Sequence, residues 1–371
     1  MPKVLVLANE YTTILHFRME LLHRLKQDGH EVILVLPPHD KNQSFKVQDW
    51  RVIEVSLNRF GMNPFQELRL LLQYVKVFSE EKPDIVLTYT AKPNIFGGLA
   101  CRFMKVPYIC NVTGLGANLQ RESLVQRVLL FLQKVSFRRA NRVFFQNTGN
   151  QCYFEQRGIL PAGRVALLPG SGVNLALHRY ETFPHGDDIT RFAVVGRLRQ
   201  DKGYDELFEA IRQVSLTNSK VEFRIAGWYE DERYKKGIDE MVSSFPVRYY
   251  GSISQEEVHE LIASCHCLIH PSHHEGMANV LMEAAAAGRP CIASDIHGCK
   301  EAIDDEVTGF LFTVKSQVAL TNAITRFLGL SRLQMESMGR SARAKMERSF
   351  DRKFVIERYA DAIKEELETE K

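Results

Sequence analysis

Short apolar runs alternate with amphipathic stretches along the first part of the chain. The apolar runs have the length of buried strands, and the stretches between them repeat apolar residues at intervals of three and four, as one face of a helix does. The pattern predicts strands at Lys3–Ala8, Glu31–Leu36 and Pro83–Thr88, and helices at Phe17–Gln27 and Pro64–Phe78. Strands that alternate with helices in this way form parallel sheets.

The same alternation restarts after an irregular stretch at residues 161–188, which is rich in proline, glycine and aspartate. A second series of strands is predicted at Phe192–Val195, Val221–Ala226, Val247–Tyr250, Cys267–Ile269 and Cys291–Ser294. We therefore expect an α/β protein with two doubly wound parallel-sheet domains that are divided in this stretch. The active site is expected between the two domains.

The composition is that of a globular protein. Of the 371 residues, 45% are hydrophobic and 25% are charged, which supplies enough apolar material for two large cores. No apolar run is long enough to span a membrane and no secretory signal is present, so we expect the protein in the cytoplasm.

Seven cysteines form an odd set without a Cys-x-x-Cys pair, and we expect most of them to be buried free thiols. Cys265, His266 and Cys267, followed by three more histidines, suggest a metal site. Successive residues of a strand point to opposite faces, however, so we expect neither a metal nor a cofactor here.

The net charge of +3 is unevenly distributed. Residues 1–180 hold 23 lysines and arginines against 13 acids, and residues 181–371 hold 25 against 32. The most basic apolar stretch, residues 121–142, is typical of a helix that lies on an anionic membrane surface. A core helix whose basic side chains reach water has the same pattern. Nucleic acid is not an expected partner, because the second half is acidic and no basic motif is interleaved with aromatics.

Two glutamates, Glu275 and Glu283, bracket a segment that changes from loop-like to helical. Eight helical positions advance about 12 Å along the axis and about 80° beyond whole turns, so both carboxylates can meet one extended ligand. The free amides and positive dipole end of a helix N-terminus favour an anionic ligand such as a diphosphate. Two solvated helix acids would give the same pattern, with Glu275 favoured by the dipole alone.

A strand, a turn and a helix at residues 191–211 carry two cations in the turn, Arg197 and Lys202. Such turns are where α/β sheets bind ligands. Paired cations stabilise a diphosphate as negative charge develops on it during its departure. Either cation alone would not indicate a diphosphate site, because lysine and arginine are common on protein surfaces.

Together these segments resemble the retaining glycosyltransferases of family 4, which have the two-domain GT-B architecture. The matching residues are VGRLRQDKG at 195–203, EGMANVLMEAAAAGRP at 275–290 and IHGCKEAIDDEVTGFLF at 296–312. The resemblance implies an acceptor-binding domain at residues 1–175 and a nucleotide-sugar-binding domain at 186–350. Residues 351–371 would return to the first domain.

The resemblance also implies the donor contacts. Arg197 and Lys202 would hold the diphosphate, Glu283 the ribose hydroxyls and Glu275 the transferred sugar, with Arg197, Lys202 and Glu275 as the catalytic residues. A departing phosphate oxygen would accept the acceptor's proton, so the reaction would need no protein base and no metal. Further donor contacts, mostly through the backbone, would come from Gly196, Gly227, Ile253, Gly276, Met277, Ala278, Asn279 and Val280.

The first domain resembles, in its motifs HFRM at 16–19, KPNIFGGLA at 92–100 and NVTGLG at 111–116, the subgroup that extends lipid-linked bacterial oligosaccharides. The loop after the first strand lacks the glycine pair of many relatives, and no histidine stands near Thr90. The resemblance implies that the acceptor contacts are His16, Arg18, Lys92, Thr113 and Gly114.

The sequence therefore predicts transfer of a hexose or N-acetylhexosamine from a UDP-sugar to a polyprenyl-diphosphate-linked saccharide. The expected setting is the assembly of lipopolysaccharide O-antigen, capsule or glycoprotein glycans, peripherally at the cytoplasmic side of the inner membrane. GDP stays open as the carrier. A UDP-sugar 2-epimerase of the same fold, or a non-catalytic sugar-nucleotide-binding partner of another transferase, are the alternatives.

Overall fold

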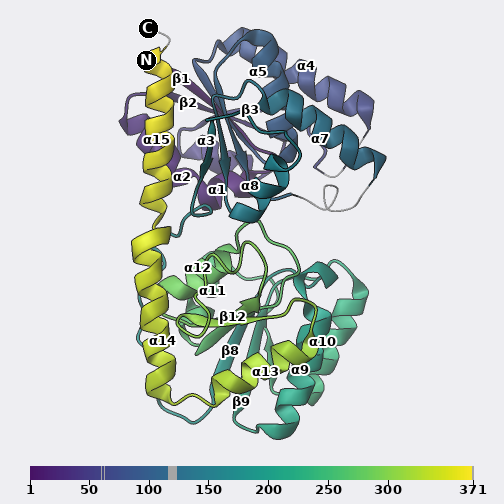
Figure 1. Cartoon of the computed structure of the whole chain (residues 1–371), viewed down its shortest axis with the longest axis vertical. Helices are drawn as coiled ribbons and strands as arrows, with labels where there is room; N and C mark the ends of the chain where they lie inside the picture. The colour runs from purple at the N-terminus through teal and green to yellow at the C-terminus, as the bar shows by residue number, and fades with distance from the viewer. Residues whose placement is uncertain (60, 62, 116–122, 370–371) are drawn as a thin grey trace. The chain divides into compact units, whose positions relative to one another are not determined.

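The computed structural model describes residues 1–59, 61, 63–115 and 123–369. The chain divides into two compact units (Figure 1). The first unit contains Met1–Ser171 and Lys353–Lys371, and the second contains Gly172–Arg352.

The first unit is built on a parallel sheet of seven strands in the order β3-β2-β1-β4-β5-β6-β7. The strands are β1 (Lys3–Leu7), β2 (Glu31–Leu36), β3 (Arg51–Glu54), β4 (Ile85–Tyr89), β5 (Tyr108–Val112), β6 (Arg142–Phe145) and β7 (Val165–Leu167). The chain runs outward in one direction from β1 and in the other from β4. The loops that follow these two strands therefore meet at the point where ligands of such sheets bind.

Helices cover both faces of this sheet. They are α1 (Tyr11–Phe17), α2 (Met19–Gln27), α3 (Asn42–Val47), α4 (Pro64–Glu81), η1 (Pro93–Gly97), α5 (Gly98–Met104), α7 (Leu124–Phe137), α8 (Thr148–Glu155) and α15 (Arg352–Thr369). One core joins the sheet to α4, α5 and α7, and the other joins it to α1, α2 and α15. In α15, Tyr359 is fully buried and accepts a hydrogen bond from Asn111 Nδ2 at 2.6 Å.

Two predicted helices have different bounds in the structure. The helix predicted at Phe17–Gln27 begins at Met19, because Arg18 leaves the helical conformation (φ −131°) and turns its side chain inward. The basic helix predicted at 121–142 spans only Leu124–Phe137, and Arg142 begins strand β6 instead. Its predicted first residue, Arg121, lies outside the described residues.

The second unit contains a parallel sheet of six strands in the order β10-β9-β8-β11-β12-β13. The strands are β8 (Thr190–Val195), β9 (Val221–Ala226), β10 (Val247–Tyr249), β11 (Cys267–His270), β12 (Cys291–Ser294) and β13 (Gly309–Phe312). The helices are η2 (Gln200–Lys202), α9 (Tyr204–Thr217), α10 (Glu232–Ser244), α11 (Gln255–Ala263), α12 (Asn279–Ala286), α13 (Gln317–Leu328), α14 (Arg332–Lys345) and η3 (Met346–Phe350). The predicted fold of two doubly wound parallel sheets is confirmed, although β13 was not predicted as a strand.

All seven cysteines are free, and only Cys152 is exposed. Within the described parts of the chain, no helix combines the length and the hydropathy needed to cross a bilayer.

Candidate active site

The site forms where two loops of the second unit meet. Strand β8 pairs with β11, and the chain runs outward in opposite directions from these two strands, so their carboxyl-end loops lie side by side. His273 donates its backbone N–H to the carbonyl of Asp201 at 2.9 Å. Gly203 has a φ of +71°, and a Cβ there would lie 2.0 Å from the carbonyl oxygen of Pro271. Only glycine allows the two loops to approach so closely.

This contact brings Lys202 of the first loop to Glu275 of the second. Lys202 Nζ donates to Glu275 Oε1 at 2.5 Å, and His270 Nε2 lies 2.8 Å from the same oxygen. The three side chains are partly buried, with exposed fractions of 19%, 13% and 9% for Lys202, Glu275 and His270. Both partners contact Oε1, so the other carboxylate oxygen, Oε2, is our candidate acceptor for a ligand hydroxyl.

The two glutamates have opposite electrostatic environments. Burial alone would raise the pKa of Glu275, but the hydrogen bond from His270 and the charge of Lys202 outweigh burial and hold this pKa well below its usual range. Burial raises the pKa of Glu283 to about 7, and the charge of Arg352 offsets this only in part. Glu275 is therefore ionised at neutral pH, whereas Glu283 exchanges a proton near pH 7.

Glu275 does not lie on the helix that carries Glu283. Helix α12 begins at Asn279, after Ala278 at the N-cap position, so the predicted helical spacing between the two glutamates is wrong. Ala278 donates its backbone N–H to the carbonyl of Gly298 at 2.9 Å, which holds the preceding residues as a loop. The backbone amide of Ala278, which was predicted to contact the donor, is therefore engaged within the protein. No side chain caps the start of α12.

The remaining donor candidates lie in neighbouring loops of the same unit. Arg197 Nη1 lies 3.6 Å from Glu230 Oε1, so Arg197 contacts an acid that follows β9 rather than Glu275. Gly227 donates its N–H to the carbonyl of Gly251 at 2.7 Å, and a Cβ at Gly227 would lie 1.8 Å from the carbonyl oxygen of Gly196. The loops after β8, β9 and β10 are thus packed backbone against backbone, and half-buried Ile253 follows them.

Two of the predicted acceptor residues are engaged inside the first unit. The Arg18 side chain is buried, and its guanidinium lies 4.7 Å from the ring centroid of Tyr89. Lys92 Nζ donates to the carbonyls of Asn58 and Gly61 at 2.6 and 2.7 Å and forms an ion pair with Glu67.

The other three predicted acceptor residues are half-buried. His16 lies in the last turn of α1, and Thr113 and Gly114 follow strand β5 directly. All three therefore belong to segments near the carboxyl ends of the strands, where α/β sheets bind ligands.

Matches to known families cover most of the chain. Residues 3–147 match the family described as "Glycosyl transferase 4-like", and residues 181–345 match "Glycosyl transferases group 1". The chain belongs to the GT-B glycosyltransferases. The solved structure of Anabaena HepE in complex with UDP and glucose shares the fold, with a TM-score of 0.80 at 18% identity over 98% of this chain and 100% of that chain.

Two curated relatives of this glycosyltransferase are bacterial enzymes. The N,N'-diacetylbacillosaminyl-diphospho-undecaprenol alpha-1,3-N-acetylgalactosaminyltransferase of Campylobacter jejuni is 27% identical over 95% of this chain and 96% of its own length. The UDP-Gal:alpha-D-GlcNAc-diphosphoundecaprenol alpha-1,3-galactosyltransferase of Escherichia coli is 24% identical over 70% of both chains.

His270 is a member of the site that was not predicted. Its position at the carboxyl end of β11, the strand next to β8, is the sequence signal that could have identified it. The neighbouring histidines have other partners in this glycosyltransferase. His266 Nδ1 accepts the backbone N–H of Arg191 at 2.9 Å, and His273 Nε2 lies 3.1 Å from Glu206 Oε1.

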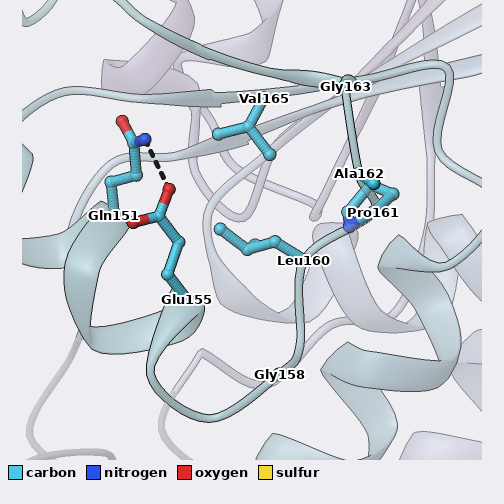
Figure 2. A pocket seen from close by; sticks show the side chains of 8 residues that line it. All are labelled: Gln151, Glu155, Gly158, Leu160, Pro161, Ala162, Gly163 and Val165. Carbon is cyan, nitrogen blue, oxygen red and sulfur yellow. Dashed lines mark hydrogen bonds between the residues drawn. The ribbon is translucent and has the colours of Figure 1, made fainter.

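A hollow in the first unit lies beside the end of α8 and strand β7 (Figure 2). Its polar side chains, Gln151 and Glu155, hydrogen-bond to each other at 2.7 Å. None of the predicted site residues lines this hollow. It therefore adds nothing to the candidate active site.

Proposed function

We propose that this glycosyltransferase moves a hexose or N-acetylhexosamine from a UDP-sugar to a saccharide linked to a polyprenyl diphosphate, with retention of the anomeric configuration. The observation that carries the proposal is the contact between Lys202 and ionised Glu275 at the point where the second sheet reverses its strand order. Lys202 supplies a cation for the leaving diphosphate and Glu275 a carboxylate for the sugar hydroxyls, and the two side chains are joined by a hydrogen bond.

In the proposed reaction the bond between the sugar's C1 and the diphosphate oxygen breaks, and the acceptor hydroxyl oxygen bonds to C1 from the same face. The hydroxyl proton passes to the departing phosphate oxygen. Lys202 stabilises the charge that develops on the diphosphate, and Arg197 joins it by exchanging Glu230 for the ligand. Glu275 Oε2 accepts a hydrogen bond from a sugar hydroxyl while His270 contacts Oε1. Glu283 accepts hydrogen bonds from the ribose hydroxyls.

The relatives support the choice of substrates. The names of the Campylobacter and Escherichia enzymes both specify an undecaprenyl-diphosphate-linked sugar and an α-1,3 linkage, and the Escherichia name specifies UDP-galactose. UDP-galactose carries its sugar in the α configuration, so an α-linked product means retention. We propose the same donor class and acceptor class for this chain.

We further propose that the acceptor binds at the carboxyl edge of the first sheet and that the protein works at the cytoplasmic membrane surface. His16, Thr113 and Gly114 lie in segments at that edge and are our candidates for acceptor contacts. Arg18 and Lys92 contact other residues of the first unit instead. A polyprenyl chain stays in the bilayer, so its enzyme must reach the membrane.

Transfer assays with single variants test this function. The purified protein is incubated with UDP- and GDP-sugars, with and without an undecaprenyl-diphosphate-linked saccharide. Lys202→Ala should lower kcat roughly a hundredfold, because one preorganised charge contact to the leaving group is lost. Lys220→Ala is the matched control, since Lys220 is exposed and pairs with exposed Asp188 in the same unit.

Three results would contradict the proposal. Epimerisation of the UDP-sugar without acceptor would indicate a 2-epimerase. Binding of the UDP-sugar without turnover would indicate a non-catalytic partner. Normal turnover by a folded Lys202→Ala variant would remove Lys202 from the reaction.

A further inference from the structure

Three helices lie together on one face of the first sheet. Helix α5 packs against both α4 and α7 (Figure 1). Their inner side chains, among them Tyr74 of α4, Cys101 of α5 and Phe137 of α7, are buried in one core with the sheet. The opposite sides of these helices face away from the sheet.

Those outward sides carry large exposed apolar side chains. Phe65 of α4 is 83% exposed, Phe103 of α5 is 76% exposed, and Leu124 and Phe131 of α7 are 77% and 64% exposed. Leu68 and Leu72 of α4 are exposed as well. We call these six residues the apolar face. Large apolar side chains that are exposed on neighbouring helices favour contact with a membrane or another molecule.

Helix α7 exposes apolar side chains although it has polar side chains that could face the solvent. This helix buries the polar side chains of Gln126, Gln133 and Ser136 while it exposes Leu124 and Phe131. Ser136 Oγ donates to the carbonyl of Asn94 at 2.5 Å, and Gln126 Nε2 donates to Tyr153 Oη at 3.1 Å. The helix is therefore oriented by polar contacts on its inner side, and its outer side presents apolar groups to the surroundings.

The charges next to the apolar face are positive. Neither α5 nor α7 contains an aspartate or a glutamate. Lys105, Arg127, Lys134 and Arg138 are all exposed at or beside these two helices. On α4, the three acids form ion pairs, Glu67 with Lys92, Glu80 with Lys76 and Glu81 with Lys3. Apolar side chains bordered by cations suit a surface of anionic lipid.

We propose that the apolar face docks onto an anionic phospholipid bilayer, with its phenylalanine and leucine side chains inserted at the level of the headgroups. The inference rests on the proposed function in one respect, since a lipid-linked acceptor requires contact with a membrane. A second copy of the chain fits less well, because a two-fold interface would bring the same cations together. The surface extends beyond the basic stretch predicted at 121–142, since it includes α4 and α5.

Vesicle flotation of the full chain tests the docking surface. The triple variant Phe65→Ser/Phe103→Ser/Phe131→Ser changes one residue on each helix. The matched control is Leu216→Ser/Val307→Ser/Leu333→Ser, which changes three exposed apolar residues of the second unit (76%, 55% and 75% exposed). Each protein is mixed with vesicles of phosphatidylglycerol and phosphatidylcholine, or of phosphatidylcholine alone.

The wild type and the control should float with the anionic vesicles, and the wild type should bind pure phosphatidylcholine at least roughly tenfold more weakly. The triple variant should bind the anionic vesicles at least roughly tenfold more weakly than the control does. Unchanged binding of the triple variant would overturn the proposal, as would equal binding of the wild type to both vesicles. A lipid-free dimer that the triple substitution dissociates, without any change in vesicle binding, would assign the face to a second copy.

Transfer to a short-chain acceptor in detergent separates this inference from the proposed function. The triple variant should keep wild-type turnover there, because none of its three residues belongs to the candidate active site. A wild type that floats but transfers no sugar would refute the proposed function and leave the docking surface standing.

Discussion

Replacement of Glu283 by glutamine should make the second unit more stable at high pH and leave its stability unchanged at low pH. Burial raises the pKa of Glu283 from its ordinary 4.5 to about 7. A carboxyl group whose pKa is higher in the folded state stabilises the fold when it is protonated, and this contribution is lost as the pH rises through the folded-state value. The wild-type protein therefore loses this stability between pH 4.5 and about 7.

The size of the effect follows from the same pKa. At about 1.4 kcal/mol for each tenfold change in acid dissociation, a pKa of about 7 instead of 4.5 corresponds to at most about 3.5 kcal/mol. The Glu283 side chain retains some exposure, so the effect should lie at roughly 1–3 kcal/mol. Glutamine is neutral at every pH, and the Glu283→Gln variant should exceed wild type by this amount at pH 8, by much less at pH 5, and not at all below about pH 4.

Urea unfolding followed by tryptophan fluorescence measures this difference. Trp50 reports on the first unit and Trp228 on the second, so a Trp50→Phe background isolates the second unit. Glu260→Gln serves as the control, because Glu260 is an exposed glutamate of the same unit. A gain in stability that is the same at pH 5 and pH 8 would refute the reasoning. The variant should also bind UDP more weakly, a change that a purely structural role for Glu283 would not produce.

Two further substitutions test the geometry of the site. His270→Phe removes a hydrogen bond that keeps the pKa of Glu275 low, so the acid limb of kcat/KM measured against pH should move to higher pH. His270→Gln should move this limb part of the way back. An unchanged pH profile would exclude His270 as a positioning residue. Gly203→Ala should destabilise the second unit by at least about 2 kcal/mol in urea unfolding, because alanine is strained at a φ of +71° and would lie 2.0 Å from the Pro271 carbonyl. Gly251→Ala, with a similar φ of +67° but open space around it, should cost clearly less, and an equal cost would show that the contact with Pro271 is unimportant.

Much of the fold could be predicted from apolar periodicity alone. Strands such as Val221–Ala226 and Cys291–Ser294 are short buried runs bounded by polar residues, and their bounds in the structure equal the predicted ones. The break at Arg18 could not be predicted in the same way. It depends on a tertiary contact of the guanidinium with Tyr89, which no local pattern contains.

The candidate site was predictable as a set of loops but not as a set of contacts. The identities of Lys202 and Glu275 follow from their positions after β8 and β11, and the sheet order then brings them together. The start of α12 at Asn279 depends on the backbone contact of Ala278 with Gly298, twenty residues later in the chain. The partner of Arg197, Glu230, and the placement of His270 beside Glu275 depend on similar contacts between loops.

The anomeric linkage of the product distinguishes a retaining transferase from an inverting one. The purified protein is given an α-linked UDP-hexose or UDP-N-acetylhexosamine labelled with ¹³C at C1, together with an undecaprenyl-diphosphate-linked saccharide. The coupling between C1 and its hydrogen in the product is then measured by NMR. We predict an α-linked sugar on the lipid-linked saccharide and one UDP released for each sugar transferred. A β-linked product, or labelled sugar that never reaches the lipid, would contradict it.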